Sequence, residues 1–248
     1  MPASLLAFLI AFTALLALER MAHRKLQEIA LLLTGHVDAA IYLYSIPLLP
    51  GVALHELSHA VMAKLLGVRV RRMTLFPQRQ RGGTVRLGSV EVLRSDNARS
   101  ALIGAAPLLA GLLVLGLIGR LVFDGSAVAG ALVAGDPGAI AGSILATLQA
   151  PDSLLWFYIV FAIANSMMPS ASDTQSWPPV IGCLGLLTAV IALFAVDVAR
   201  ALAPAVETTL RWLAAALSIT AFVDLVVVAL LWVIALIVAR ATGRRVEH

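Results

Sequence analysis

Long apolar runs alternate with short polar stretches along most of this chain. A helix needs about 20 apolar residues to cross the hydrocarbon core of a bilayer. Six runs approach or exceed that length, although the first and the fourth are short. We therefore predict an all-α polytopic membrane protein with about six transmembrane helices, at Ser4–Leu18, Ile41–Leu66, Ala101–Val122, Ser153–Met168, Val180–Ala199 and Ala214–Ala239.

The second apolar run is interrupted by Pro47 and by Pro50-Gly51. Proline removes a backbone donor and obstructs the preceding turn, so we predict a kink or a break in this helix. Broken helices inside membranes usually line a cavity. The helix is expected to end before Gly67, a residue type that favours the position after a helix.

Between about 68 and 93 the pattern changes, and valines and leucines alternate with charged residues. Period-two alternation with glycine-containing turns predicts a small β element, with a hairpin around Gly88-Ser89. The alternative is a solvated basic loop. An exposed strand edge could hold a peptide in an extended conformation.

The composition supports the membrane class. The chain is 60% hydrophobic and 13% charged, with a mean hydropathy of +0.95, which excludes an ordinary soluble domain. The single Cys183 excludes an intramolecular disulfide, and we interpret it as a small buried apolar residue.

The net charge of +4 is interpreted as a topology signal, and we expect no nucleic acid partner. With six spans, both termini share a side with the segments 67–100 and 169–179, and twelve of the 18 basic residues fall on that side, eight of them in 67–100 and three at the C-terminus, with Lys64. By the positive-inside rule these segments, and both termini, are predicted to be cytoplasmic.

A candidate metal-binding motif lies in the second apolar run, where His55-Glu56-Leu57-Ser58-His59 has the pattern H-E-x-x-H. Residues four apart on a helix share a face, so both imidazoles can bind one metal ion, and Glu56 can act as the general base. Chance placement predicts only about 0.002 such matches per chain. The alternative is a pair of histidines satisfied by hydrogen bonds, but ionisable groups in a membrane cost about 2.5–3.5 kcal/mol each, and a divalent cation is the simplest compensation.

The third ligand has two candidates. Asp173 follows Pro169 at the end of the fourth run and is predicted to face the same side as the end of the metal-binding helix. An aspartate in such a turn can equally be a cap or a solvated residue. Asp224 lies within an apolar run and is the strongest rival.

These residues carry a resemblance to a known family. The H-E-x-x-H motif, Gly104-Ala105-Ala106-Pro107 and Asn165-x-x-x-Pro169-x-x-x-Asp173 resemble the site-2 protease family of intramembrane zinc metalloproteases over about residues 38–180. The resemblance implies zinc coordination by His55, His59 and Asp173, a zinc-bound water activated by Glu56, a role for Asn165 in substrate binding or oxyanion stabilisation, and a membrane-associated β element at about 68–93. Thr174 stands where the family commonly has glycine, so this chain looks like a minimal, divergent member.

We therefore expect three parts: residues 1–37 with the first helix, a catalytic core at 38–180, and a C-terminal helix pair at 181–248. The expected function is hydrolysis of peptide bonds in or near membrane spans, in single-span proteins or signal peptide remnants. The expected location is the cell membrane of a bacterium or archaeon. Two alternatives are a membrane metal-binding or transport protein and a non-catalytic relative that binds membrane segments.

Overall fold

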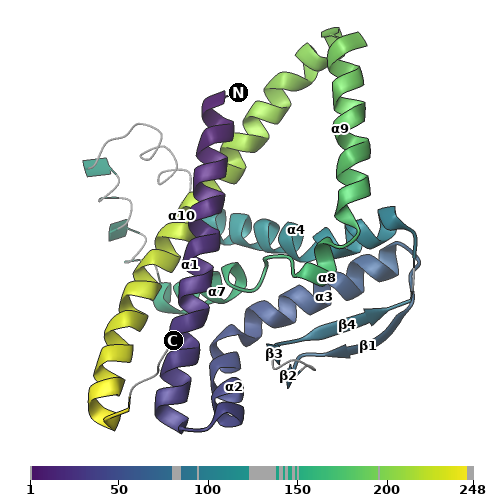
Figure 1. The fold of residues 1–248 in the computed structure, drawn as a ribbon. Helices are drawn as coiled ribbons and strands as arrows, with labels where there is room; N and C mark the ends of the chain where they lie inside the picture. Colours follow the sequence, from purple (N-terminus) through teal and green to yellow (C-terminus); the bar gives the residue numbers. More distant parts are fainter. Residues whose placement is uncertain are drawn as a thin grey trace.

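A computed structural model describes residues 2–79, 85–93, 95–122, 151–194 and 196–244, with a few single positions between 138 and 149. Helices dominate these residues (Figure 1). Their bounds are α1 (Pro2–Thr34), α2 (Val37–Ser45), the 3-10 helix η1 (Ile46–Leu48), α3 (Leu49–Leu65), α4 (Asn97–Leu121), α7 (Ser153–Ala164), α8 (Ala171–Thr174), α9 (Trp177–Phe194) and α10 (Val196–Thr242). The helical class is as predicted from the apolar runs.

Four helical stretches, instead of the six predicted spans, are long and apolar enough to cross a membrane among the described residues: Ala3–Thr34, Val37–Leu65, Asn97–Leu121 and Val196–Thr242. The 12-residue α7 is shorter than the usual membrane span. The connection predicted after residue 199 is helical, so that α10 runs on for 47 residues. The boundaries predicted at Ala199 and Ala214 are wrong because hydropathy measures how apolar a segment is, and a helix can continue through polar positions.

The break predicted in the second run is confirmed. Helix α2 stops at Ser45, one 3-10 turn follows, and α3 starts at Leu49 with Pro50 in its first turn. Proline is tolerated there because the first helical N–H groups have no intrahelical partner. The break sets the direction of α3, which carries the H-E-x-x-H motif.

Capping residues fix the ends of the helices around the site. Gly67 has φ of +71° and follows the end of α3, as predicted. Asp96 accepts a hydrogen bond from the backbone N–H of Arg99 and starts α4, and this bond lowers the pKa of Asp96. Ser170 starts α8 with a capping box to Asp173.

The segment after α3 is extended. Strands β1 (Val70–Thr74) and β4 (Ser89–Val92) are antiparallel, as are β2 (Gln78–Arg79) and β3 (Val85–Arg86). The hairpin predicted around Gly88-Ser89 is misplaced, because Ser89 pairs with Thr74 and the chain reverses between β2 and β3. The glycine marks an irregularity between two strands, and residues 80–84 lie outside the described part. The pair of β1 and β4 lies along α3, and β2 and β3 lie at the far end of that pair (Figure 1).

The helices around the site pack closely. Helix α1 runs beside α10, while α3 packs against α4 and α7 (Figure 1). Gly51 on α3 touches the backbone of Ala162 on α7 and leaves no room for a larger side chain. One apolar cluster includes Leu15, Met167 and Leu217 from α1, the end of α7 and α10. Helix α3 is therefore held between α4, α7 and the strands.

Candidate metal centre

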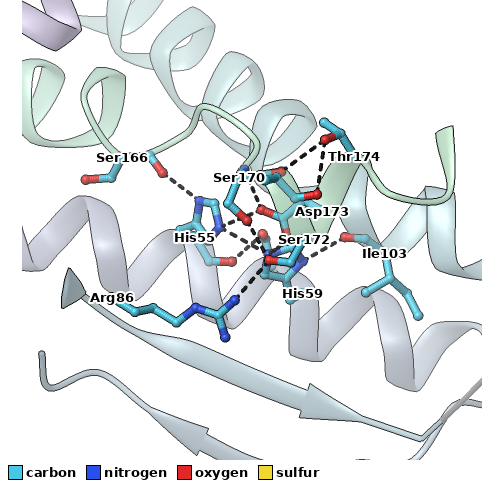
Figure 2. Close-up of polar contacts among 11 residues, drawn as sticks. His55, His59, Arg86, Ile103, Ser166, Ser170, Ser172, Asp173 and Thr174 are labelled. Atoms are coloured by element: carbon cyan, nitrogen blue, oxygen red, sulfur yellow. Dashed lines mark hydrogen bonds and ion pairs between the residues drawn. The ribbon is translucent and has the colours of Figure 1, made fainter. Parts of the chain in front are cut away.

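The two histidines of the motif lie on consecutive turns of α3, as predicted. Their Nε2 atoms are 3.1 Å apart, and their rings meet edge to face. His59 is buried and His55 is half-buried. Figure 2 shows both rings pointing toward Asp173.

The opposite nitrogen of each ring is fixed by a backbone carbonyl. The Nδ1 atom of His55 lies 2.6 Å from the carbonyl oxygen of Ser166, and Nδ1 of His59 lies 2.8 Å from that of Ile103 (Figure 2). A carbonyl only accepts, so both Nδ1 atoms carry the hydrogen. In the neutral rings both Nε2 lone pairs are then free to bind a metal, which is the usual outer arrangement of metal-binding histidines.

Proline explains why the Ile103 carbonyl is available. In a helix this oxygen would accept from the N–H group four residues later, but that residue is Pro107, which has none. The same spacing separates Asn165 from Pro169, and the Asn165 carbonyl accepts a hydrogen bond of 2.9 Å from Nε2 of His23. Pro107 thus leaves a carbonyl inside α4 free to position a histidine, whereas the Asn165 carbonyl is free because α7 ends at Ala164.

Asp173 completes the group from α8. Its Oδ1 lies 3.3 Å from Nε2 of His59, and its Oδ2 lies 3.7 Å from Nε2 of His55. Oδ2 also accepts a 2.7 Å hydrogen bond from the backbone N–H of Ser170. Burial by itself raises the pKa of Asp173, but hydrogen bonds from His55 and His59, donated when their Nε2 atoms carry a proton, and from Ser170 hold it well below its usual range. Asp173 is therefore an anionic candidate ligand at neutral pH.

The three residues fit a divalent cation. Their ligand atoms all lie within 4.8 Å of one another. Around a tetrahedral ion at about 2.0–2.1 Å, ligand atoms are about 3.3 Å apart, close to the separations of 3.1, 3.3 and 3.7 Å found here. Two Nε2 lone pairs and a carboxylate repel one another without a cation between them. The donor set of two imidazoles and one carboxylate is one that zinc uses.

A glycine on α4 lets α8 come close enough. Gly104 contacts the carbonyl oxygen of Asp173 so tightly that an added Cβ would collide with it. The small-residue run therefore serves at Gly104 as a packing face for α8, against the backbone of the candidate ligand.

Glu56 lies on α3 beside the histidines and is buried, with 6% of its surface exposed. The strands cover it: a Cβ added at Gly88 would lie 2.8 Å from its Oε1. Arg86, two residues earlier, interacts electrostatically with the Glu56 carboxylate. The predicted base therefore lies under the bend between β3 and β4.

Asn165 is placed differently from the other predicted site residues. Its side chain is 1% exposed, and its Nδ2 donates 2.9 Å hydrogen bonds to the carbonyl of Phe161 and to Oδ1 of Asp224. Asp224 is thus paired with Asn165 and is not in the group of three. Its role as a rival ligand loses its basis, and the substrate role of Asn165 stays a prediction.

The sequence analysis assigns no role to two residues that contribute to this region, His23 and Arg86. His23 bonds to the Asn165 carbonyl and contacts Tyr44. Arg86 donates a 3.0 Å hydrogen bond to Oγ of Ser172, next to Asp173. Pro107, four residues after Ile103, was a signal that could have predicted a free carbonyl in α4, although not its histidine partner; the Ser166 carbonyl has no such signal.

Comparisons with family models, with curated proteins and with solved structures found no match to this chain.

Proposed function

We propose that this protein is an intramembrane zinc metalloprotease of the site-2 protease type. The observation that carries the proposal is the convergence of His55, His59 and Asp173 beside the buried carboxylate of Glu56. Zinc, when bound, supplies a Lewis acid that polarises the scissile carbonyl and acidifies a water molecule. We propose the cell membrane as the location.

The predicted cytoplasmic position of both termini does not fit the packing of α1 on α10: Arg244, just after α10, donates a hydrogen bond to the carbonyl of Leu32, near the end of α1. The two helices therefore run in the same direction, and a chain in which both cross the membrane has its termini on opposite sides.

Glu56 performs the proton transfers. It takes a proton from the attacking water as the water oxygen bonds to the carbonyl carbon, and it gives that proton to the amide nitrogen as the C–N bond breaks. His55 and His59 keep their Nδ1 hydrogens on the Ser166 and Ile103 carbonyls throughout, so that Nε2 keeps its direction.

The substrate class follows from the surroundings of the group. Its ligands come from a helix long and apolar enough to cross a membrane and from the short helix α8, and strands lie beside them. We propose that single-span membrane proteins or signal peptide remnants are cut after local unwinding. The strands then hold the unwound segment extended.

The two alternative functions, a metal transporter and a non-catalytic relative, are less well supported by the described residues. A membrane metal transporter would be supported by acidic residues from several spans converging on the histidines, but among the described residues Asp224 pairs with Asn165. A non-catalytic relative would be supported by an Asp173 far from the histidines, whereas their ligand atoms lie 3.3 and 3.7 Å apart.

The test combines metal content with cleavage. We expect about one zinc per purified chain, lost in His59→Ala and in Asp173→Ala, as measured by elemental analysis. Glu56→Gln should keep its zinc but cut a membrane-segment substrate about 10²–10⁴-fold more slowly, because the proton acceptor is gone. Zinc-free wild-type protein after metal-replete purification, or full cleavage by Glu56→Gln, would contradict the proposal.

A further inference from the structure

A hydrolytic site needs a group to stabilise the negative charge that develops on the scissile carbonyl oxygen. The family resemblance assigns this or a substrate-binding role to Asn165. In the structure both amide hydrogens of Asn165 have acceptors, the Phe161 carbonyl and the Asp224 carboxylate, and the side chain is 1% exposed. Zinc, when bound, would carry part of this charge, and a hydrogen bond to the carbonyl oxygen would then have to come from a residue other than Asn165.

Arg86 has the chemistry and the placement. It lies on β3, is exposed, and extends from the strand toward Ser172 and the histidines (Figure 2). Its Nη2 donates a 3.0 Å hydrogen bond to Oγ of Ser172, the residue before Asp173. This bond uses one of five guanidinium N–H groups. An exposed guanidinium at the edge of the ligand group can meet a substrate that enters from the strand side.

The segment from Arg86 to Gly88 lies beside Glu56, so that a cation and an anion lie near each other at the proposed site. Gly88 packs on Glu56, while Arg86 interacts electrostatically with the same carboxylate. One bend of the chain thus covers the base and carries the cation. A peptide lying along these strands would pass both groups.

We propose that Arg86 is a catalytic residue whose guanidinium donates a hydrogen bond to the scissile carbonyl oxygen; this inference rests on the proposed protease function. As the water oxygen bonds to the carbonyl carbon, the π electron pair moves onto the oxygen and the water proton moves to Glu56. When the C–N bond breaks, the pair returns to re-form the carbonyl and the proton passes to the nitrogen. Arg86 stabilises the charge between these steps and exchanges no proton.

The experiment compares Arg86→Gln, Arg86→Lys and Ser172→Ala in full-length protein in detergent, with an apolar peptide substrate. We expect Arg86→Gln to lower kcat by about 10²–10³-fold with little change in KM and unchanged zinc content. Arg86→Lys should be intermediate, because it keeps the charge but loses the planar fork. Ser172→Ala removes the contact of Arg86 but not the guanidinium, and should keep kcat within a few-fold.

A binding measurement provides a readout besides turnover. A phosphinic peptide carries a tetrahedral P–O⁻ group that imitates the charged oxygen, and Arg86→Gln should bind it at least about tenfold more weakly than wild type. Equal effects of Arg86→Gln and Ser172→Ala would make Arg86 a structural link and overturn the inference, as would wild-type kcat in Arg86→Gln. Because the wild-type protein must cut the peptide first, its inactivity would reject the proposed function itself.

Discussion

Two polar groups lie among the apolar helices, and they are built in opposite ways. His55, His59 and Asp173 direct acceptor atoms at one another, and each histidine has its other nitrogen on a backbone carbonyl. Asn165 and Asp224 share one hydrogen bond, yet Oδ1 of Asn165 and Oδ2 of Asp224 are buried with no protein partner.

The difference shows how a candidate metal centre can be told apart from a buried polar pair in an apolar interior. Burial of acceptors is common to both groups, and Asp224 is the more deeply buried, at 0% exposed. Only the first group has its remaining hydrogen-bonding positions occupied so that the converging atoms keep one orientation. The fixed orientation of the side chains, and not the burial of charge, therefore distinguishes a group suited to bind a metal from a polar pair that only packs in the interior.

The largest expected effect tests how closely α8 must approach. Gly104→Ala places a methyl group against the Asp173 carbonyl, so the ligand must move. We expect zinc affinity to fall at least about 10–100-fold, the range seen when the surroundings of a ligand are disturbed. Competition with a chelator measures it.

Gly116→Ala is the matched control for Gly104→Ala. It lies on the same helix with nothing within 4 Å of the added carbon, and should leave the affinity unchanged. Equal affinities in the two variants would show that the contact of Gly104 with Asp173 does not position the ligand.

A smaller effect on the same group is expected from Pro107→Ala. The new N–H group can bond to the Ile103 carbonyl and compete with Nδ1 of His59. Zinc affinity should fall, by less than in Gly104→Ala, because the ring loses part of its fixation while the ligand atoms stay in place. Higher helix stability with unaltered zinc affinity would contradict the role of the free carbonyl.

The smallest effect on zinc is expected at the second polar group. Asn165→Ala leaves the buried Asp224 without its amide donor, which should cost about 1–3 kcal/mol of stability. Asp224→Asn keeps the shape without the charge and should be tolerated. Both variants should retain about one zinc, measured beside thermal unfolding in detergent. Loss of zinc in Asp224→Asn would show that Asp224 contributes to the zinc site and would contradict the distinction between the two groups.

The sequence sufficed for the parts of the site set by local spacing. The four-residue separation of His55 and His59 placed both on one helix face, and prolines predicted the break before α3. From the sequence Asp173 is only one of two candidate ligands, because local sequence does not determine which distant turn packs against the helix that carries the histidines. Its position depends on Gly104, whose small size is visible in the sequence but whose neighbour is not.

The spans and the covering strands were harder to predict. Hydropathy divided α10 at its polar positions, and the length of α7 could not be separated from the loop that follows. Glycine at 88 suggested a turn, although it is required for close approach to Glu56. The carbonyl partners of the two motif histidines carry no side-chain signal, apart from Pro107 four residues after Ile103.

The bond from His55 to the Ser166 carbonyl joins positions 111 residues apart. During synthesis both histidines emerge well before the end of α7 and before Asp173. A nascent or truncated chain that stops ahead of residue 165 therefore has the motif but neither the third ligand nor the carbonyl that orients the first. If the group binds a metal as proposed, a complete site would form only after most of the chain has been inserted.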